Sequence, residues 1–271
     1  MRTDSITLNP VGFVKSQITD CHDMPLSGIQ AQINVFPQFS AALERIEEYS
    51  HLWILTWFHK ARRDLTTVVP TKVNPLSHKY GVFAIRSPVR PNPIALTLVK
   101  LEQAQDNILY VAGLDAIDGT PVLDIKPYFE HDVIFSARTP YIAPLKPELQ
   151  KKTLLSQALT YHGEVCSDLL IAVRMAIVAC DQLEYIKSLN VKVEVIGSPC
   201  LADTLQGLCR ARLANPSRFT YSPATEQKQS IWTNGIMRLT LTCLRELDEA
   251  GFWGLTDQEV FDITLEENET P

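Results

Sequence analysis

Residues 95–117 read ALTLVKLEQAQDNILYVAGLDAI and contain two runs typical of strands, ALTLVKLEQ and NILYVAGLDAI. Both runs are rich in β-branched and aromatic residues and end at turn-like boundaries. One helix is expected at 39–50, with Ser40 as its N-cap. The first half of the chain therefore predicts a mostly β domain of about 140 residues. Its other strand-like runs lie at 6–16, 31–36, 51–58 and 80–85.

The pattern changes after TPYIAPLKPELQ, a segment at 139–150 that holds three prolines and is typical of a linker. Beyond it, 154–186 has helical periodicity, and a strand, a helix and a strand are expected at 191–197, 200–214 and 236–247. We therefore predict an α+β protein. Its expected parts are a first domain at 1–142, a linker at 143–152 and an α+β domain at 153–271.

Composition places the chain among ordinary globular proteins, with 45% hydrophobic and 21% charged residues among 271. No apolar run is long enough for a membrane span and the N-terminus is polar, so we expect a cytoplasmic protein without a membrane partner. The net charge is −6, of which residues 146–271 contribute −5, so any contact with RNA must use a local basic patch. Five of the six cysteines follow residue 160, which favours metal binding or burial over a disulfide framework.

The 11 glycines exclude two common nucleotide-binding motifs. No two of them are separated by a single residue, and none has the spacing of GxxxxGK. The dinucleotide fingerprint and the phosphate loop are both absent, so a nucleotide-like cofactor must be held by side chains and another kind of loop.

RSPVRPNP, at 86–93, is stiff because its three prolines fix φ and favour extended neighbours. Arg86 and Arg90 stand on this rigid backbone, and guanidinium groups bind carboxylates or phosphates in bidentate fashion. Asn92 adds a planar donor and acceptor that suits a base edge. A proline-rich turn with solvated arginines is the structural alternative.

Two further segments place polar residues beside predicted strands. His59 and Lys60 follow the apolar run at 51–58, and either a ligand contact or a satisfied histidine at a strand end explains them. Asp115, Asp118 and Asp124 surround a Gly-Thr-Pro turn, where acids could accept hydrogen bonds from sugar hydroxyls or an amine. A simple β-turn at Asp118-Gly119 is the structural alternative.

Three motifs, EYSHLWILTWFHK, YGVFAIRSPVRPNPIALTLVKLE and LDAIDGTPVLDIKPY, together resemble the TsaA/TrmO family of S-adenosylmethionine-dependent methyltransferases. The resemblance spans roughly 8–140 of the chain. It implies a mostly antiparallel, barrel-like β domain, a homodimer and a cofactor near the dimer interface. It also implies methylation of the exocyclic amine (N6) of threonylcarbamoyl adenosine beside the tRNA anticodon.

The resemblance also implies which residues face the cofactor. MPLSG, at 24–28, is similar to the family's Pro-x-Gln-Gly loop, with Ser27 in place of the usual Gln, and His59-Lys60 stands where the family has His-Gln. Ala95 replaces a common Gly. The residues expected at the cofactor are Ser27, Gly28, His59, Lys60, Arg86, Ser87, Leu96, Leu114, Asp115, Asp118, Gly119 and Thr120.

The reaction is an in-line displacement at a sulfonium methyl, which requires alignment of the acceptor and removal of a proton from it. His59 and Asp118 are the expected catalytic residues, as proton acceptors. Arg90 and Asn92 are assigned to the substrate. Either Arg86 or Arg90 could bind the methionine carboxylate or a carboxylate on the acceptor.

The second half is similar to the FmdE-like domain, a family associated with metal binding, in YHGEVCSDLLIAVRMAIVA and SPCLADTLQGL. His162 and Cys166 are four apart and would share one face of a helix. With Cys200 they would supply three ligands and an open position, which suits zinc or nickel. Asp203 and Gln206 are candidates to orient a ligand, and helix-surface polarity is the plainer explanation of both. A buried histidine and small buried cysteines are the alternative to a metal site.

Three functions remain open on the sequence alone. The first is the tRNA methyltransferase that the resemblance implies, with the second half as an accessory. The second is a methyltransferase for a small thiol, metal-bound or cofactor-like acceptor presented by the FmdE-like half. The third is a non-enzymatic sensor of S-adenosylmethionine and metal.

Overall fold

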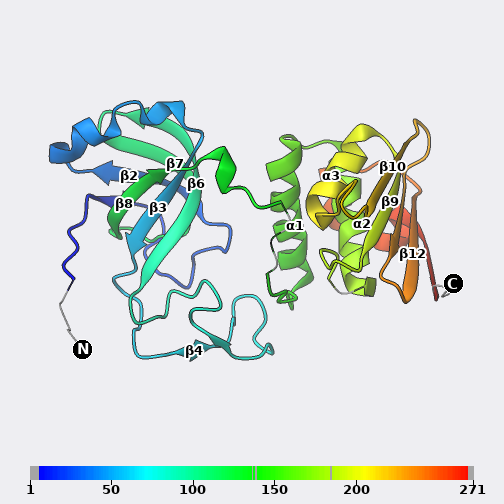
Figure 1. The fold of residues 1–271 in the computed structure, drawn as a ribbon, viewed down its shortest axis with the longest axis horizontal. Helices are drawn as coiled ribbons and strands as arrows, with labels where there is room; N and C mark the ends of the chain where they lie inside the picture. Colours follow the sequence, from blue (N-terminus) through cyan, green and yellow to red (C-terminus); the bar gives the residue numbers. More distant parts are fainter. Residues whose placement is uncertain (1–5, 136, 138, 184, 268–271) are drawn as a thin grey trace. The chain divides into compact units, whose positions relative to one another are not determined.

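The computed structural model describes residues 6–135, 137, 139–183 and 185–267. The chain forms two compact units, Met1–Val133 and Ile134–Pro271 (Figure 1). The predicted linker at 143–152 overlaps helix α1, which begins at Pro147. The domain limits expected from the sequence, at 142 and 153, stay predictions.

A closed barrel of six strands forms the first unit, in the order β1-β2-β7-β6-β3-β8, and every strand pair is antiparallel. Alternate side chains such as Ile33, Leu52 and Leu109 point inward and are fully buried. The strands are β1 (Gly12–Lys15), β2 (Ile29–Val35), β3 (His51–Trp57), β6 (Ile94–Gln105), β7 (Ile108–Leu114) and β8 (Pro121–Pro127). With the helices and sheet of the second unit, they confirm the α+β fold class and the barrel-like first domain.

The prediction of one helix at 39–50 is wrong. Two short 3₁₀ helices, η1 (Pro37–Leu43) and η2 (Ile46–Glu48), lie there, because Arg45 has φ 66° and interrupts the run. Neither helix fully buries a residue; Leu43 and Ile46 pack against the barrel core but stay partly exposed, which gives a longer α-helix little tertiary stabilisation. Ser40 is not an N-cap; it lies inside η1 and its hydroxyl donates to the Pro37 oxygen at 2.6 Å.

The prediction of a strand at 80–85 is also mostly wrong. Only Tyr80–Gly81 (β5) pairs, with Thr67–Val68 (β4), and turns follow it. Arg90 explains these turns, because its guanidinium donates to the Val82 and Ile85 backbone oxygens at 2.7 and 2.8 Å. A third 3₁₀ helix, η3 (Glu130–Asp132), follows the barrel.

The second unit packs helices on a five-stranded sheet of order β10-β9-β11-β12-β13, in which only the β10–β9 pair is parallel. The apolar helix α2 is almost entirely buried. The helices are α1 (Pro147–His162), α2 (Ser167–Leu183), α3 (Pro199–Cys209), α4 (Glu249–Gly254) and α5 (Asp257–Val260). The strands are β9 (Lys192–Gly197), β10 (Phe219–Pro223), β11 (Gln229–Thr233), β12 (Met237–Cys243) and β13 (Phe261–Glu267).

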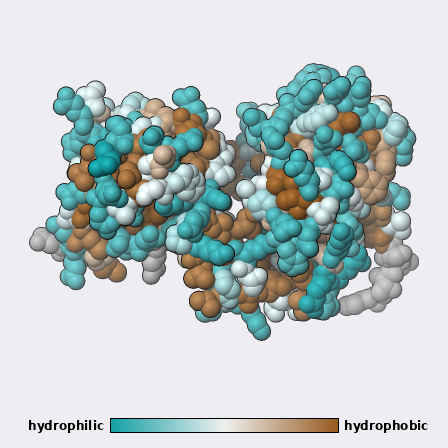
Figure 2. All heavy atoms as spheres, turned by 180° about the vertical axis from the view of Figure 1, so that it is seen from behind, coloured by the Kyte–Doolittle hydropathy of each residue, from teal (hydrophilic) through white to brown (hydrophobic). Residues whose placement is uncertain are grey.

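Two left-handed residues end helices that the sequence pattern would continue. Gly163, at φ 86°, divides the periodic run 154–186 into α1 and α2. Arg210, at φ 58°, ends α3 before the predicted limit of 214. Both units expose hydrophobic side chains among hydrophilic ones (Figure 2). Within the described residues, no helix combines the length and apolarity that crossing a membrane requires.

Candidate functional sites

The barrel topology brings the predicted cofactor segments to one rim. Neighbouring strands are antiparallel, so the end of one strand and the start of the next in the barrel lie at the same rim. The ends of β1, β3 and β7 and the starts of β2, β6 and β8 all meet there. The segments 27–28, 59–60, 86–92, 114–115 and 118–120 lie at or beside these strand ends.

Gly28 fixes the first of these segments against β7. Its φ is 67°, and a Cβ there would lie 2.4 Å from the backbone carbon and oxygen of Gly113. Only glycine allows this approach without a shift of the backbone. The loop carrying Ser27 is therefore held beside Leu114, another residue expected at the cofactor.

Asp115 follows β7 and is oriented by a residue that sequence reasoning missed. The Thr97 hydroxyl, on β6, donates to Asp115 Oδ1 at 2.5 Å. Leu96 lies on the opposite, outward-facing side of β6 and is 48% exposed. The contact between Thr97 and Asp115 depends on the register between β6 and β7, which no local motif announces.

His59 and Lys60 lie next to the arginine–proline segment. The Phe58 backbone N–H donates to the Pro93 oxygen at 2.8 Å, which joins the two segments. Lys60 Nζ donates to the Thr19 oxygen at 3.3 Å. The His59 side chain is exposed, yet partial burial and then the Lys60 charge lower its pKa. The imidazole is therefore mostly neutral at pH 7.

Asp118 is already engaged by the chain itself. Its Oδ1 accepts the Ser16 backbone N–H at 3.0 Å and lies 3.5 Å from Lys15 Nζ. The Ser16 hydrogen bond is the main reason that the pKa of Asp118 is lowered. Next to it, a Cβ on Gly119 would meet open space, and the Thr120 hydroxyl is buried and donates to the Ile117 oxygen at 2.7 Å.

The two arginines of the segment 86–93 differ sharply. Arg90 Nε donates to the Ser87 backbone oxygen at 2.9 Å, in addition to its two bonds to the preceding turns. Arg86 is exposed, and its side chain makes no hydrogen bond or ion pair within the described part of the chain. Asn92 is exposed as well, whereas the Ser87 hydroxyl accepts the Val89 N–H at 3.2 Å. Arg86, rather than Arg90, is placed to meet a ligand.

In the second unit, His162, Cys166 and Cys200 come together, with their ligand-type atoms within 4.8 Å of one another. The prediction that His162 and Cys166 share one face of a helix is wrong, because α1 ends at His162 and Cys166 precedes α2. The left-handed turn at Gly163 instead returns the chain so that Cys166 Sγ lies 3.3 Å from His162 Nε2. Cys200 joins them from the first turn of α3.

Asp203 orients the histidine of this cluster. His162 Nδ1 lies 3.2 Å from Asp203 Oδ2, which leaves Nε2 directed at the sulfur. Carboxylate–histidine pairs of this kind are common behind metal-binding imidazoles. Gln206 does not orient the imidazole; its Nε2 donates a hydrogen bond to the Ala211 backbone oxygen at 3.5 Å. Cys209 is fully buried, and burial raises its pKa to about 12, so it stands apart from the cluster.

A charged network beside the cluster escaped sequence reasoning, because its members come from separate segments. Lys228 Nζ lies 2.7 Å from Asp168 Oδ1 and also pairs with Glu246. The Ser198 hydroxyl donates to the other oxygen of Asp168. The Ser167 hydroxyl donates to Glu246 Oε2 at 2.5 Å.

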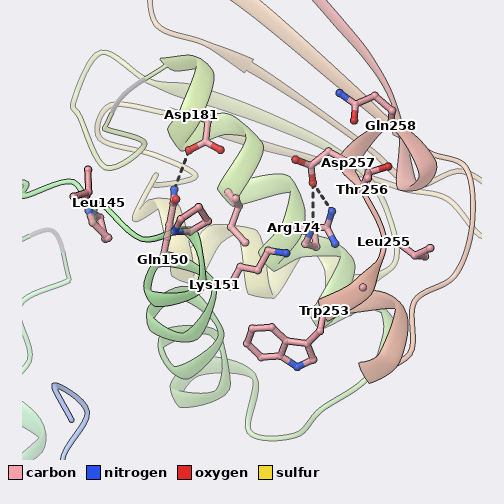
Figure 3. A pocket seen from close by; sticks show the side chains of 14 residues that line it. Leu145, Gln150, Lys151, Arg174, Asp181, Trp253, Leu255, Thr256, Asp257 and Gln258 are labelled. Carbon is pink, nitrogen blue, oxygen red and sulfur yellow. Dashed lines mark hydrogen bonds and ion pairs between the residues drawn. The ribbon is translucent and has the colours of Figure 1, made fainter. Parts of the chain in front are cut away.

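A cavity of about 580 Å³ lies between the start of α1, the middle of α2 and the α4–α5 turn (Figure 3). Its floor is Arg174, which is 1% exposed and donates to Asp257 Oδ1 at 3.1 and 2.5 Å and to the Phe252 oxygen at 2.9 Å. At the edge, Asp181 accepts a bond from Gln150 at 3.2 Å, and burial raises its pKa. The Arg174–Asp257 pair therefore joins α2 to α5.

The sequence profile of the tRNA-methyltransferase O N-terminal domain matches residues 13–132. A probable S-adenosyl-L-methionine-binding protein of Methanothermobacter thermautotrophicus is 43% identical over 129 residues, which are 46% of this chain and 91% of that protein. One of Archaeoglobus fulgidus is 34% identical over 223 residues, 78% of this chain. The alignment covers only 60% of that relative's length.

A mouse tRNA (adenine(37)-N6)-methyltransferase is 50% identical over 97 residues, which are 35% of this chain and 22% of that protein. Among solved structures, a crystal structure of TrmO is 24% identical, with a TM-score of 0.42 over 89% of this chain and 95% of that one. These sequence matches show that the chain belongs to the tRNA-methyltransferase O family of S-adenosylmethionine-dependent methyltransferases. The family expected from the three N-terminal motifs is confirmed.

Proposed function

We propose that this protein transfers a methyl group from S-adenosylmethionine to N6 of threonylcarbamoyl adenosine beside the tRNA anticodon. The observation that carries the proposal is the meeting of five chain segments at one barrel rim. Family membership supports the cofactor, and the name of the mouse relative supports an adenine N6 acceptor in tRNA.

The rim residues fit the chemistry of S-adenosylmethionine, which supplies an electrophilic sulfonium methyl when bound. Arg86 offers a guanidinium for a carboxylate, and Asp115, fixed by Thr97, offers an acceptor for hydroxyls or an ammonium group. Gly119 leaves open space for close approach to the backbone. The buried Thr56 hydroxyl, near the rim end of β3, has no hydrogen-bond partner within the described residues.

His59 is the proposed proton acceptor for the adenine amine. Its lowered pKa keeps the imidazole neutral, and its exposure leaves it accessible to a large acceptor. Asp118 is a weaker base, because it accepts the Ser16 N–H and its pKa is lowered. Asp118 then serves to fix the 118–120 turn, while the rim aligns acceptor and methyl carbon.

Methylation of tRNA is the direct test. The protein is incubated with labelled S-adenosylmethionine and total tRNA from a strain that lacks its own family member. Label is expected on the adenosine beside the anticodon, and not on tRNA prepared without the threonylcarbamoyl group. Absence of label in both samples, with the cofactor bound, would reject the proposed acceptor.

We also propose that His162, Cys166 and Cys200 hold a transition metal, zinc or nickel, in the second unit. The observation that favours it is the approach of three ligand-type atoms to within 4.8 Å, with Asp203 behind the imidazole. Three protein ligands leave one position open, as in catalytic rather than structural zinc sites. The similarity of this half to the FmdE-like domain stays a prediction.

Elemental analysis tests the metal. One equivalent per chain is expected in the wild type and in Cys21→Ser, and none in Cys166→Ser. Cys21 is the matched control, since it lies with Asp20 and His22 in a fully exposed group of ligand-type side chains. If Cys21→Ser loses the metal and Cys166→Ser keeps it, the metal site is the group of Asp20, Cys21 and His22 instead.

A homodimer is the proposed assembly, in the cytoplasm. The outward face of β6 carries three exposed apolar side chains in a row, Ile94, Leu96 and Leu98. Burial of such a strip against a second copy would remove apolar surface from water at about 25 cal/mol per Å².

A further inference from the structure

We propose that Cys166 and Cys200 form a reversible disulfide when the metal position is empty. The two cysteines are 34 positions apart in sequence, yet their sulfurs lie within 4.8 Å. Both side chains are partly exposed, so a small oxidant reaches them. The proposal rests on the same side chains as the metal proposal, but it does not require that a metal binds.

The local backbone favours this pairing. Cys166 directly precedes α2, and Cys200 lies in the first turn of α3, so neither sulfur is enclosed by its own helix. A disulfide needs a sulfur–sulfur distance of about 2.05 Å, which side-chain rotation must supply. The other cysteine of α3, Cys209, is fully buried and does not compete for Cys166.

Cys166 is the first sulfur to react. Its Sγ accepts the Leu169 backbone N–H at 3.4 Å and lies 3.3 Å from His162 Nε2, so two polar groups hold this sulfur in place at the open side of the cluster. Against a peroxide, the Cys166 thiolate forms an S–O bond while the O–O bond breaks. The product is a sulfenic acid, and the hydroxide that leaves takes up a proton to become water.

Cys200 completes the reaction. Its thiolate attacks the Cys166 sulfur, so the S–S bond forms and the S–O bond breaks. The departing hydroxide takes up the proton that Cys200 released and becomes a second water. Overall, two thiols lose two electrons and two protons, and one hydrogen peroxide is reduced to two waters.

The disulfide would leave His162 as the only unmodified member of the cluster. Oxidation and metal binding therefore exclude one another at this site. A bound metal protects both sulfurs, and a dithiol reductant restores the site, which makes the second unit responsive to peroxide.

The test uses full-length protein freed of metal with a chelator, desalted and treated with hydrogen peroxide. Trypsin releases Cys166 in 153–174 and Cys200 in 193–210, and cleavage before Asp203 then separates Cys200 from Cys209. Mass spectrometry is expected to find most of the Cys166 peptide joined to the Cys200 peptide, with the loss of two hydrogens. Dithiothreitol should reverse it.

Three variants make the result decisive. Cys21→Ser, which removes an exposed thiol elsewhere, should form the same cross-link, and Cys166→Ser and Cys200→Ser should not. Oxidation that stops at separate sulfinic acids, or joins Cys166 to another cysteine, overturns the proposal. A cross-link in protein that binds neither zinc nor nickel in separate titrations rejects the metal proposal alone. Binding of either metal without a cross-link after peroxide treatment of the metal-free protein rejects only the disulfide proposal.

Discussion

His59 is the residue on which the proposed chemistry depends, and its state follows from burial and a neighbouring charge. Both lower its pKa, so the neutral imidazole persists to more acidic pH than the usual value of about 6.5 would allow. Activity should fall as pH decreases through this lowered pKa, because the protonated ring no longer accepts a proton.

The first prediction concerns His59→Gln. The substitution should reduce kcat/KM by roughly 10²-fold and remove the acidic limb of the pH profile. Steady-state rates between pH 5 and 9 would measure both effects. An acidic limb that survives in His59→Gln assigns proton transfer to another group.

The second prediction separates the two arginines. Arg86→Ala should weaken S-adenosylmethionine binding by about 2 kcal/mol and leave the melting temperature unchanged, because its side chain makes no hydrogen bond or ion pair with any described residue. Arg90→Ala should lower stability by about 2 kcal/mol, because it removes three bonds to backbone oxygens. Calorimetry and thermal unfolding report the two effects, and the opposite pattern would exchange the roles.

At the scale of elements, Gly28 decides how the loop before β2 meets β7. In Gly28→Ala, the new Cβ would lie 2.4 Å from the Gly113 backbone at a φ of 67°, so the loop must move. We expect a loss of about 2–3 kcal/mol in unfolding free energy, together with weaker cofactor binding.

Gly119→Ala is the control for Gly28→Ala. Its φ is also positive, at 74°, but a Cβ would meet open space. The expected cost is about 1 kcal/mol, from backbone strain alone. Equal costs in urea unfolding would show that packing against Gly113 contributes nothing.

The Arg174–Asp257 pair makes a further prediction for the join of α2 to α5. Asp257→Ala leaves the guanidinium of Arg174 buried without its carboxylate, which should destabilise the protein by about 3 kcal/mol. Asp262→Ala, an exposed aspartate nearby in sequence, should cost little. Urea unfolding measures both variants.

Local patterns predicted some elements well and others poorly. The strands at 95–103 and 107–117 were recognisable because their residue types suit a half-buried strand, and they became β6 and β7. The segment 80–85 has similar residues, but Arg90 holds it in turns through backbone bonds. The strands β4 and β8 of the first unit and β10, β11 and β13 of the second were not predicted.

The candidate sites also contain residues that local patterns predicted and residues that they did not. Motifs identified the rim segments and the trio His162, Cys166 and Cys200, because each carries recognisable residue types in order along the chain. Thr97 beside Asp115 and the network of Asp168, Lys228 and Glu246 depend on strand register and on contacts between distant segments. One sequence alone does not contain that information.

At the scale of the whole molecule, the proposed homodimer gives the last prediction. Leu96→Glu places a charge in the centre of the outward apolar strip of β6 and should convert a dimer to monomers. Sedimentation at several concentrations measures the change, with Leu189→Glu, an exposed leucine of the second unit, as control. A wild type that sediments as a monomer contradicts the proposed assembly.

Closure of the barrel has a consequence for how the protein avoids aggregation. A closed sheet has no unpaired edge, so the first unit offers no barrel strand for backbone pairing with another chain. The five-stranded sheet of the second unit is open and ends at β10 and β13. β13 finishes with Glu266 and Glu267, charges that discourage strand addition. Resistance to edge-to-edge association therefore comes from topology in the first unit and from charge at the β13 edge of the second.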